Sequence, residues 1–106
     1  MLKRSFRLAK KDMDRIYKKG QKAAQDLFVV RYLPNRSSHA RFSVIISKKV
    51  LAKAVDRNQA KRKIYNLISS QEANWNNKFF DIALTLKRYD ETNLASSLLQ
   101  TLERVR

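Results

Sequence analysis

Residues 47–70 read SKKVLAKAVDRNQAKRKIYNLISS, and this stretch decides the fold. Its second half predicts an amphipathic helix, because four apolar residues fall within an arc of roughly 100° at the helical repeat. These residues are Ala60, Ile64, Leu67 and Ile68. The opposite face carries Asn58, Lys61, Arg62 and Tyr65, with Arg57 on the border between the two faces. The segment therefore predicts a helix with an apolar inner side and a largely basic outer side.

Two strands are expected before this helix. Residues 41–47 alternate, with Phe42, Val44 and Ile46 on one side and serine or isoleucine on the other. Residues 27–33, LFVVRYL, are rich in β-branched and aromatic side chains and stop at a Pro-Asn turn signal. The short polar connection between the two segments predicts that they pair as an antiparallel hairpin.

A first helix is expected over residues 10–19. Met13, Ile16 and Tyr17 stand at positions i, i+3 and i+4, which places them on one face. Gly20 follows where a left-handed C-terminal cap is favoured, because glycine has no Cβ to clash there.

The C-terminal part of the chain predicts a loop, a strand and a helix. Residues 71–78 form a polar loop around Trp75. The strand, residues 79–87, has one apolar side made of Phe80, Ile82, Leu84 and Leu86. The helix, residues 91–104, has a stripe of Leu94, Leu98 and Leu102, with Asp90 as its expected N-cap.

The order helix, strand, strand, helix, strand, helix predicts the α+β class, with helices packed in two layers on a small mixed sheet. The chain has 106 residues, of which 43% are hydrophobic, enough for a single core. We therefore expect one domain over residues 1–106, in which residues 1–9 form a basic N-terminal arm.

The net charge of +15 is distributed unevenly. Residues 1–63 carry 19 basic and 4 acidic side chains, whereas residues 64–106 carry 5 of each. This asymmetry predicts a polyanionic partner that contacts one part of the fold. Nucleic acid is favoured over an anionic membrane surface, because the aliphatic stripes of the helices are typical of core positions.

The chain lacks the residues for independent catalysis. His39 is the sole histidine and lies in a polar turn, where a solvated role is expected. Asp12 and Asp14 face different directions on their helix, and Asp56 and Asp81 have no obvious partner. Because a metal-dependent nuclease needs converging carboxylates, we expect neither a catalytic residue nor a metal site in this chain. The absence of cysteine and of long apolar runs is consistent with a cytoplasmic protein without a membrane partner.

A row of basic residues lies at the strand end and along the predicted helix. Its members are Lys48, Lys49, Lys53, Arg57, Lys61, Arg62 and Lys63, and Asp56 is the one acidic residue among them. Such a row can meet successive phosphates of a nucleic acid and release condensed counterions. About six phosphate contacts would give a log–log salt slope of about −4 to −5.

The same residues resemble the RNR region of the protein component of bacterial ribonuclease P. The pattern of that family is a strand ending in (S/A)KK, a short crossover, and A-V-x-R-N-R-x-K-R opening a helix. Residues that match it here are Ser47, Lys48, Lys49, Ala54, Val55, Arg57, Asn58, Lys61 and Arg62. The segments RLAKKDMDRIYKKG and RFSVIIS resemble the arm, first helix and strand of the family. Two positions depart from the pattern, because Gln59 and Tyr65 stand where basic residues are usual, with Lys53 and Lys63 as candidates to compensate.

This resemblance implies a ribonucleoprotein that removes the 5′ leader of precursor tRNA. It implies that the catalytic groups and Mg²⁺ belong to the RNA subunit, which would contact Lys48, Lys49, Arg57, Asn58, Lys61 and Arg62. We add Lys53 to these expected RNA-binding residues because it belongs to the same basic row. It also implies a leader-binding cleft between the first helix and the sheet, formed by Met13, Tyr17, Val29 and Arg31. The implied fold is ribosomal protein S5 domain 2-like, with a left-handed βαβ crossover that the usual handedness rule would not predict.

Two other functions remain open from the residues themselves. A ribosomal or other structural RNA-binding protein would share the small size, high charge and α+β order. A DNA-binding helix-turn-helix module is disfavoured, because a strand and not a first helix precedes the basic helix, and no DNA partner is expected.

Overall fold

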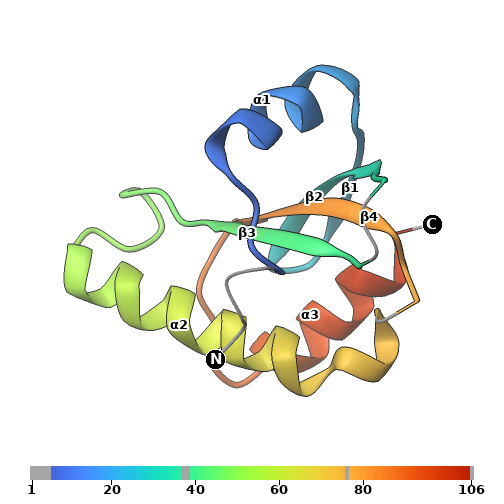
Figure 1. The fold of residues 1–106 in the computed structure, drawn as a ribbon. Coiled ribbons are helices and arrows are strands. Elements are labelled where there is room, and N and C mark those ends of the chain that lie inside the picture. Colours follow the sequence, from blue (N-terminus) through green and yellow to red (C-terminus); the bar gives the residue numbers. More distant parts are fainter. Residues whose placement is uncertain (1–5, 37–38, 76, 106) are drawn as a thin grey trace.

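The computed structural model describes residues 6–36, 39–75 and 77–105, with Lys10 and Asn74 described by their backbone alone. Residues 1–5 of the predicted arm lie outside this part. The elements, in chain order, are α1 (Lys10–Lys19), β1 (Gln21–Gln25), β2 (Phe28–Pro34), β3 (Arg41–Ile45), α2 (Ala54–Ser70), the 3₁₀ turn η2 (Glu72–Asn74), β4 (Phe80–Leu86) and α3 (Leu94–Glu103) (Figure 1). The three predicted helices and three predicted strands are confirmed, and β1 is an additional strand.

The strands form one mixed sheet in the order β1-β2-β4-β3. The predicted hairpin between residues 27–33 and 41–47 is therefore wrong. β2 pairs antiparallel with β1 on one side and with β4 on the other, while β3 pairs with β4 in parallel. The reason is burial: β4 is apolar on both faces, with Ile82, Ala83 and Leu84 all buried, so it takes a central position.

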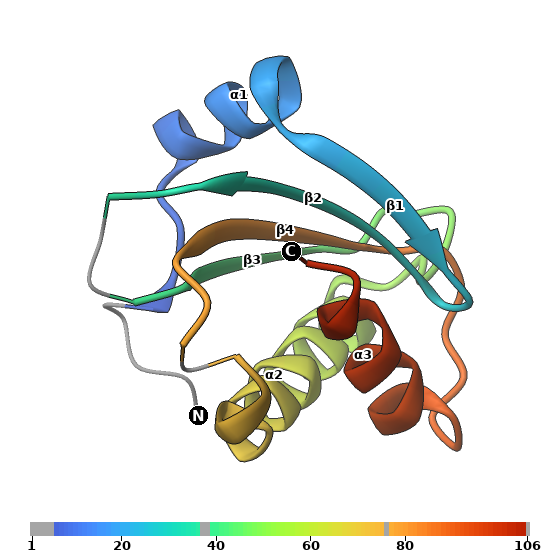
Figure 2. The ribbon, with the colours of Figure 1, turned by 90° about the vertical axis from the view of Figure 1, so that its right-hand side faces the viewer.

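The connection from β3 through α2 to β4 is a left-handed crossover. In Figure 1, β3 and β4 both run from right to left, α2 returns beneath the sheet, and β4 lies behind β3. In Figure 2 the two strands again lie above α2, with β3 at the outer edge of the sheet. The handedness implied by the family resemblance is thus present, against the usual preference for right-handed crossovers.

Helices α2 and α3 cover one face of the sheet, and α1 lies on the other (Figure 2). The main core lies between the sheet and the helices α2 and α3. The predicted apolar stripes form it, since Ala60, Ile64 and Ile68 of α2 and Leu94, Leu98 and Leu102 of α3 are all buried. Leu67 is partly buried against the same core.

Trp75 belongs to this core and not to a solvated loop. Its ring is 2% exposed and packs edge-on against Phe42, with ring centroids 4.9 Å apart. Its indole N–H donates to the carbonyl of Ile68 at 2.8 Å, so the polar end of the side chain is satisfied at the C-terminal end of α2.

Two predicted helix caps are wrong. Gly20 is extended, with φ −76° and ψ 158°, because the chain passes directly from α1 into β1. A side chain does not fit there, since a Cβ would lie 2.5 Å from the carbonyl oxygen of Ile16. Asp90 accepts hydrogen bonds from the N–H of Thr92 and the amide of Asn93, so it stabilises the turn before α3 rather than the helix itself. The hydrogen bond from Asn93 is the main cause that lowers the pKa of Asp90.

Candidate nucleic-acid interface

The loop between β3 and α2 presents two lysines to solvent. The carbonyl of Ser47 accepts hydrogen bonds from the N–H groups of Val50 and Leu51, at 3.1 and 3.2 Å, which closes a tight turn. Lys48 and Lys49 occupy this turn and are exposed. The turn therefore points both ammonium groups away from the core.

Arg57 holds the second half of this loop against α2. Its Nη1 donates to the carbonyl oxygens of Leu51 at 2.9 Å and Ala52 at 2.7 Å, and its side chain is half-buried. Part of the guanidinium thus has a structural partner, while the remaining N–H groups stay available to a ligand. Lys53 is exposed immediately before α2, where the positive end of the helix dipole adds to its charge.

The outer face of α2 carries the predicted basic residues. Asn58 and Arg62 are exposed and Lys61 is half-exposed, and the three follow one another along one side of the helix. Lys63 does not belong to this row of side chains, because its ammonium group pairs with Glu91. The hydrogen bond to Glu91 is the main cause that raises the pKa of Lys63. Lys63 is therefore engaged within the chain, and the expectation that it compensates for Gln59 or Tyr65 is not supported.

Tyr65 and Arg7 extend this surface in a way that the sequence did not predict. The guanidinium of Arg7 lies over the Tyr65 ring, 4.9 Å from its centroid. Arg7 belongs to the described end of the arm, residues 6–9, and forms a β-bridge with Phe42 at the outer edge of β3. We define the basic surface as Arg7, Lys48, Lys49, Lys53, Arg57, Asn58, Lys61 and Arg62. The basic composition of the arm could have indicated Arg7 as an RNA contact. The sequence does not show, however, that Arg7 lies against Tyr65 of α2.

The four predicted cleft residues lie on α1 and β2. Arg31 places its guanidinium 4.8 Å from the centroid of the Tyr17 ring, so these two side chains are in contact. Tyr17 is 46% exposed, whereas Met13 and Val29 are half-buried. Ile16 is the α1 side chain that packs into the sheet, at 1% exposure, which leaves the Tyr17 side of the helix accessible.

Asp81 has partners, contrary to the sequence prediction. Its carboxylate is fully buried at the start of β4 and accepts hydrogen bonds from Arg41, Arg15 and Asn35, at 2.8–3.0 Å. Burial alone would raise the pKa of Asp81, but the hydrogen bonds from Arg41, Asn35 and Arg15 and the charge of Arg41 outweigh it, and the pKa is lowered. This cluster ties α1 to the sheet through Arg15.

The described residues form no cluster of side chains that could hold a metal ion. No group of three His, Cys, Asp or Glu side chains lies together in this part of the chain. His39 is half-buried, packs edge-on against Phe6, and places Nδ1 3.0 Å from the carbonyl oxygen of Ala40. In the described part of the chain, no helix is long and apolar enough to cross a membrane.

The mixed sheet, the left-handed crossover and the basic surface define a small basic α+β protein whose charge fits a polyanionic partner. A sequence model of the family Ribonuclease P matches residues 2–106, and the chain belongs to this family.

Individual relatives agree with this assignment. A ribonuclease P protein component of Streptococcus pneumoniae is 41% identical over 70 residues, which are 65% of this chain and 56% of the relative. The match thus spans little more than half of that protein. The structure of the RNase P protein from Thermotoga maritima, in complex with 1-(4-fluorophenyl)-2-thiourea, aligns with a TM-score of 0.84 and 25% identity, covering 94% of this chain and 100% of that one. The RNase P protein of Staphylococcus aureus aligns with a TM-score of 0.82 and 29% identity, covering 94% and 96%.

Proposed function

We propose that this chain is the protein subunit of a ribonuclease P holoenzyme, which removes the 5′ leader of precursor tRNA in the cytoplasm. The observation that carries the proposal is the basic surface, which exposes lysine and arginine side chains from three adjacent segments with little internal neutralisation. Such a surface fits the phosphate backbone of a folded RNA. In this proposal the basic surface binds the ribonuclease P RNA.

The leader would bind on the opposite face of the sheet. Tyr17 is exposed and Arg31 lies against its ring, so the pair offers a flat stacking surface and a cation to an unpaired nucleotide. Met13 and Val29 would form the apolar sides of this cleft. The protein would then contact the two RNA partners from opposite sides of the sheet.

The hydrolytic chemistry is assigned to the RNA subunit and its Mg²⁺ ions. The carboxylates of the described chain do not converge as Mg²⁺ ligands would, so we derive no step through a protein-held metal. The protein's own contribution is to bind and orient the substrate and to neutralise phosphate charge, which lowers the Mg²⁺ concentration that the RNA needs.

The decisive experiment is cleavage of precursor tRNA by the cognate ribonuclease P RNA at low Mg²⁺, with and without this protein. We expect strong stimulation by the protein, and no cleavage by the protein alone. Tight RNA binding without stimulation would instead favour a structural RNA-binding protein, and co-purification with ribosomal particles would identify that alternative. Preference for duplex DNA at moderate salt would contradict both.

A further inference from the structure

Helix α1 divides its face of the sheet into two regions. Ile16 is buried beneath the helix, Met13 and Tyr17 project to one side of it, and Asp12 and Arg15 project to the other. The predicted leader cleft lies on the Tyr17 side. A pocket of about 540 Å³ lies on the Arg15 side, within the size range of roughly 300–1,000 Å³ that is typical of ligand sites.

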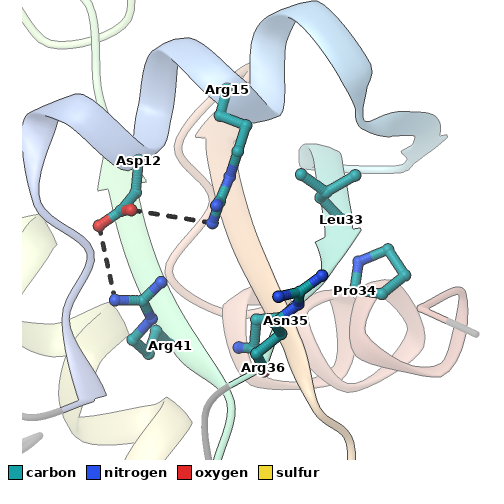
Figure 3. A pocket seen from close by; sticks show the side chains of 7 residues that line it. All are labelled: Asp12, Arg15, Leu33, Pro34, Asn35, Arg36 and Arg41. Carbon is teal, nitrogen blue, oxygen red and sulfur yellow. Dashed lines mark ion pairs between the residues drawn. The ribbon is translucent and has the colours of Figure 1, made fainter.

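Figure 3 shows how side chains surround this pocket. Arg15 points from α1 towards the strands, Arg36 lies opposite it after the end of β2, and Leu33 and Pro34 form an apolar wall on one side. Arg41 and Asp12 close the other side, where dashed lines mark the ion pairs of Asp12 with Arg41 and with Arg15. The pocket therefore combines cationic groups with a short apolar surface.

The three arginines are not equally available to a ligand. Arg41 is used within the chain, because Nε and Nη2 donate to Asp81 and Nη1 lies 3.5 Å from Asp12. Arg15 uses only Nη2, which lies 3.0 Å from Asp81 and 3.8 Å from Asp12, so its Nε and Nη1 remain free of described partners. Arg36 makes no hydrogen bond or ion pair with any residue that the structure describes.

The charge of the pocket favours an anion. Three guanidinium groups face one lining carboxylate, Asp12, and one buried carboxylate, Asp81, so one positive charge is in excess. Both carboxylates already have arginine partners, and Asp81 holds Arg15 in a defined orientation. Guanidinium groups with free N–H edges bind phosphate oxygens in a bidentate manner, and their planes stack on bases.

We propose that this pocket binds one unpaired nucleotide of an RNA strand, with its phosphate at Arg15 and Arg36 and its base against Leu33 and Pro34. The inference rests on the proposed function and adds a second RNA contact, on the far side of α1 from the cleft. The same chemistry is present in a nucleotide of the precursor leader and in an unpaired nucleotide of the ribonuclease P RNA. The experiment below distinguishes these two sources.

The first test compares Arg36→Gln with Arg88→Gln, which removes the same charge from an exposed arginine that pairs with Asp26 away from the pocket. The affinity of each variant is measured for the ribonuclease P RNA alone. The affinity of each reconstituted holoenzyme is then measured for precursor tRNAs with leaders of increasing length. We expect Arg36→Gln to weaken one of these interactions about fivefold or more, and Arg88→Gln to change neither by more than about twofold. Weaker binding of long leaders alone identifies the leader as the source, and weaker binding of the RNA subunit identifies the catalytic RNA.

A second test locates the nucleotide directly. The chain contains no cysteine, so Arg36→Cys introduces a single thiol that can carry a photo-crosslinker, with Arg88→Cys as the control. We expect a crosslink to one defined nucleotide from position 36 only. The pocket proposal is overturned, and the proposed function stands, if three results are found together. Wild-type protein stimulates cleavage, Arg36→Gln and Arg88→Gln have the same affinities for the ribonuclease P RNA and for the precursor tRNAs, and position 36 gives no crosslink. If wild-type protein neither binds RNA nor stimulates cleavage, both are overturned.

Discussion

Arg7 lies over the ring of Tyr65, with its guanidinium carbon 4.9 Å from the ring centroid. The two residues are brought together by the outer edge of β3, because the N–H of Leu8 donates to the carbonyl of Phe42 at 2.7 Å and the N–H of Val44 donates to the Tyr65 hydroxyl at 3.2 Å. Tyr65 stands where the family pattern has a basic residue. A positive charge is nevertheless present at this point of the surface, supplied by the arm instead of the helix.

Replacement of Arg7 by glutamine is expected to weaken binding to the ribonuclease P RNA. If Arg7 contacts one phosphate, the magnitude of the log–log salt slope should fall by about one. The midpoint of thermal unfolding should change little, because the β3 edge contacts of the arm are made by the backbone. The measurement is RNA affinity over a salt series, with Arg88→Gln as the matched loss of charge. An unchanged slope would show that Arg7 does not contact a phosphate of the RNA.

The Tyr65→Phe variant separates the two contacts of this tyrosine. The phenylalanine ring still stacks with Arg7, so RNA affinity should remain within about twofold of wild type. The N–H of Val44 loses its acceptor, which should lower the free energy of unfolding by about 1–3 kcal/mol. Urea unfolding measures this loss. A variant as stable as wild type would indicate that water replaces the hydroxyl.

Neighbouring lysines on α2 should differ in their effect on RNA binding. Lys61 lies on the outer face of the helix, whereas Lys63 pairs with Glu91. Lys61→Ala should therefore reduce the salt slope by about one, and Lys63→Ala should reduce it less. The two variants remove the same charge and the same side chain, two residues apart, so each controls for the other. Equal effects would mean that RNA recruits Lys63 away from Glu91.

The helices and most strands could be predicted because their signals are local. Met13, Ile16 and Tyr17 predict α1 by spacing alone, and Leu94, Leu98 and Leu102 do the same for α3, although α3 begins three residues later than expected. The segment Gln21–Gln25, QKAAQ, was missed because it contains no β-branched or aromatic side chain. It is a strand because the tight turn at Asp26, with φ 44°, folds it back onto β2.

Strand pairing and the partners of charged groups could not be predicted, because they depend on contacts between distant parts of the chain. The central place of β4 follows from its burial on both faces, which a single strand does not reveal. Likewise, the sequence does not show which of the basic residues Arg57, Lys61 and Lys63 have partners within the chain. Carbonyl groups of the crossover loop engage Arg57, and Glu91, 28 residues away, engages Lys63.

Asp81 should contribute strongly to stability because it is the buried member of the cluster that joins α1 to β3 and β4. Asp81→Asn keeps the shape of the side chain but leaves Arg15 and Arg41 without their carboxylate. We expect a loss of about 2–3 kcal/mol, below the roughly 3–5 kcal/mol of a fully buried pair, because both arginines are partly exposed. Asp14→Asn, at an exposed position of α1, is the control and should change stability by less than about 0.5 kcal/mol.

The same carboxylate predicts a dependence of stability on pH. The pKa of Asp81 is lowered in the folded protein below the value of about 3.9 that is usual for aspartate in unfolded chains. Its contribution is therefore fully present above about pH 5, decreases as the pH falls through the unfolded pKa, and is lost below the folded pKa. We expect the difference in free energy of unfolding between wild type and Asp81→Asn to be constant from pH 7 to about pH 5 and to shrink at lower pH. Urea unfolding of both proteins over this range measures the difference. The contributions of the other carboxylates are the same in both proteins and cancel in it. A difference that stays constant into acid would contradict the assignment of this stability to the ionised carboxylate of Asp81.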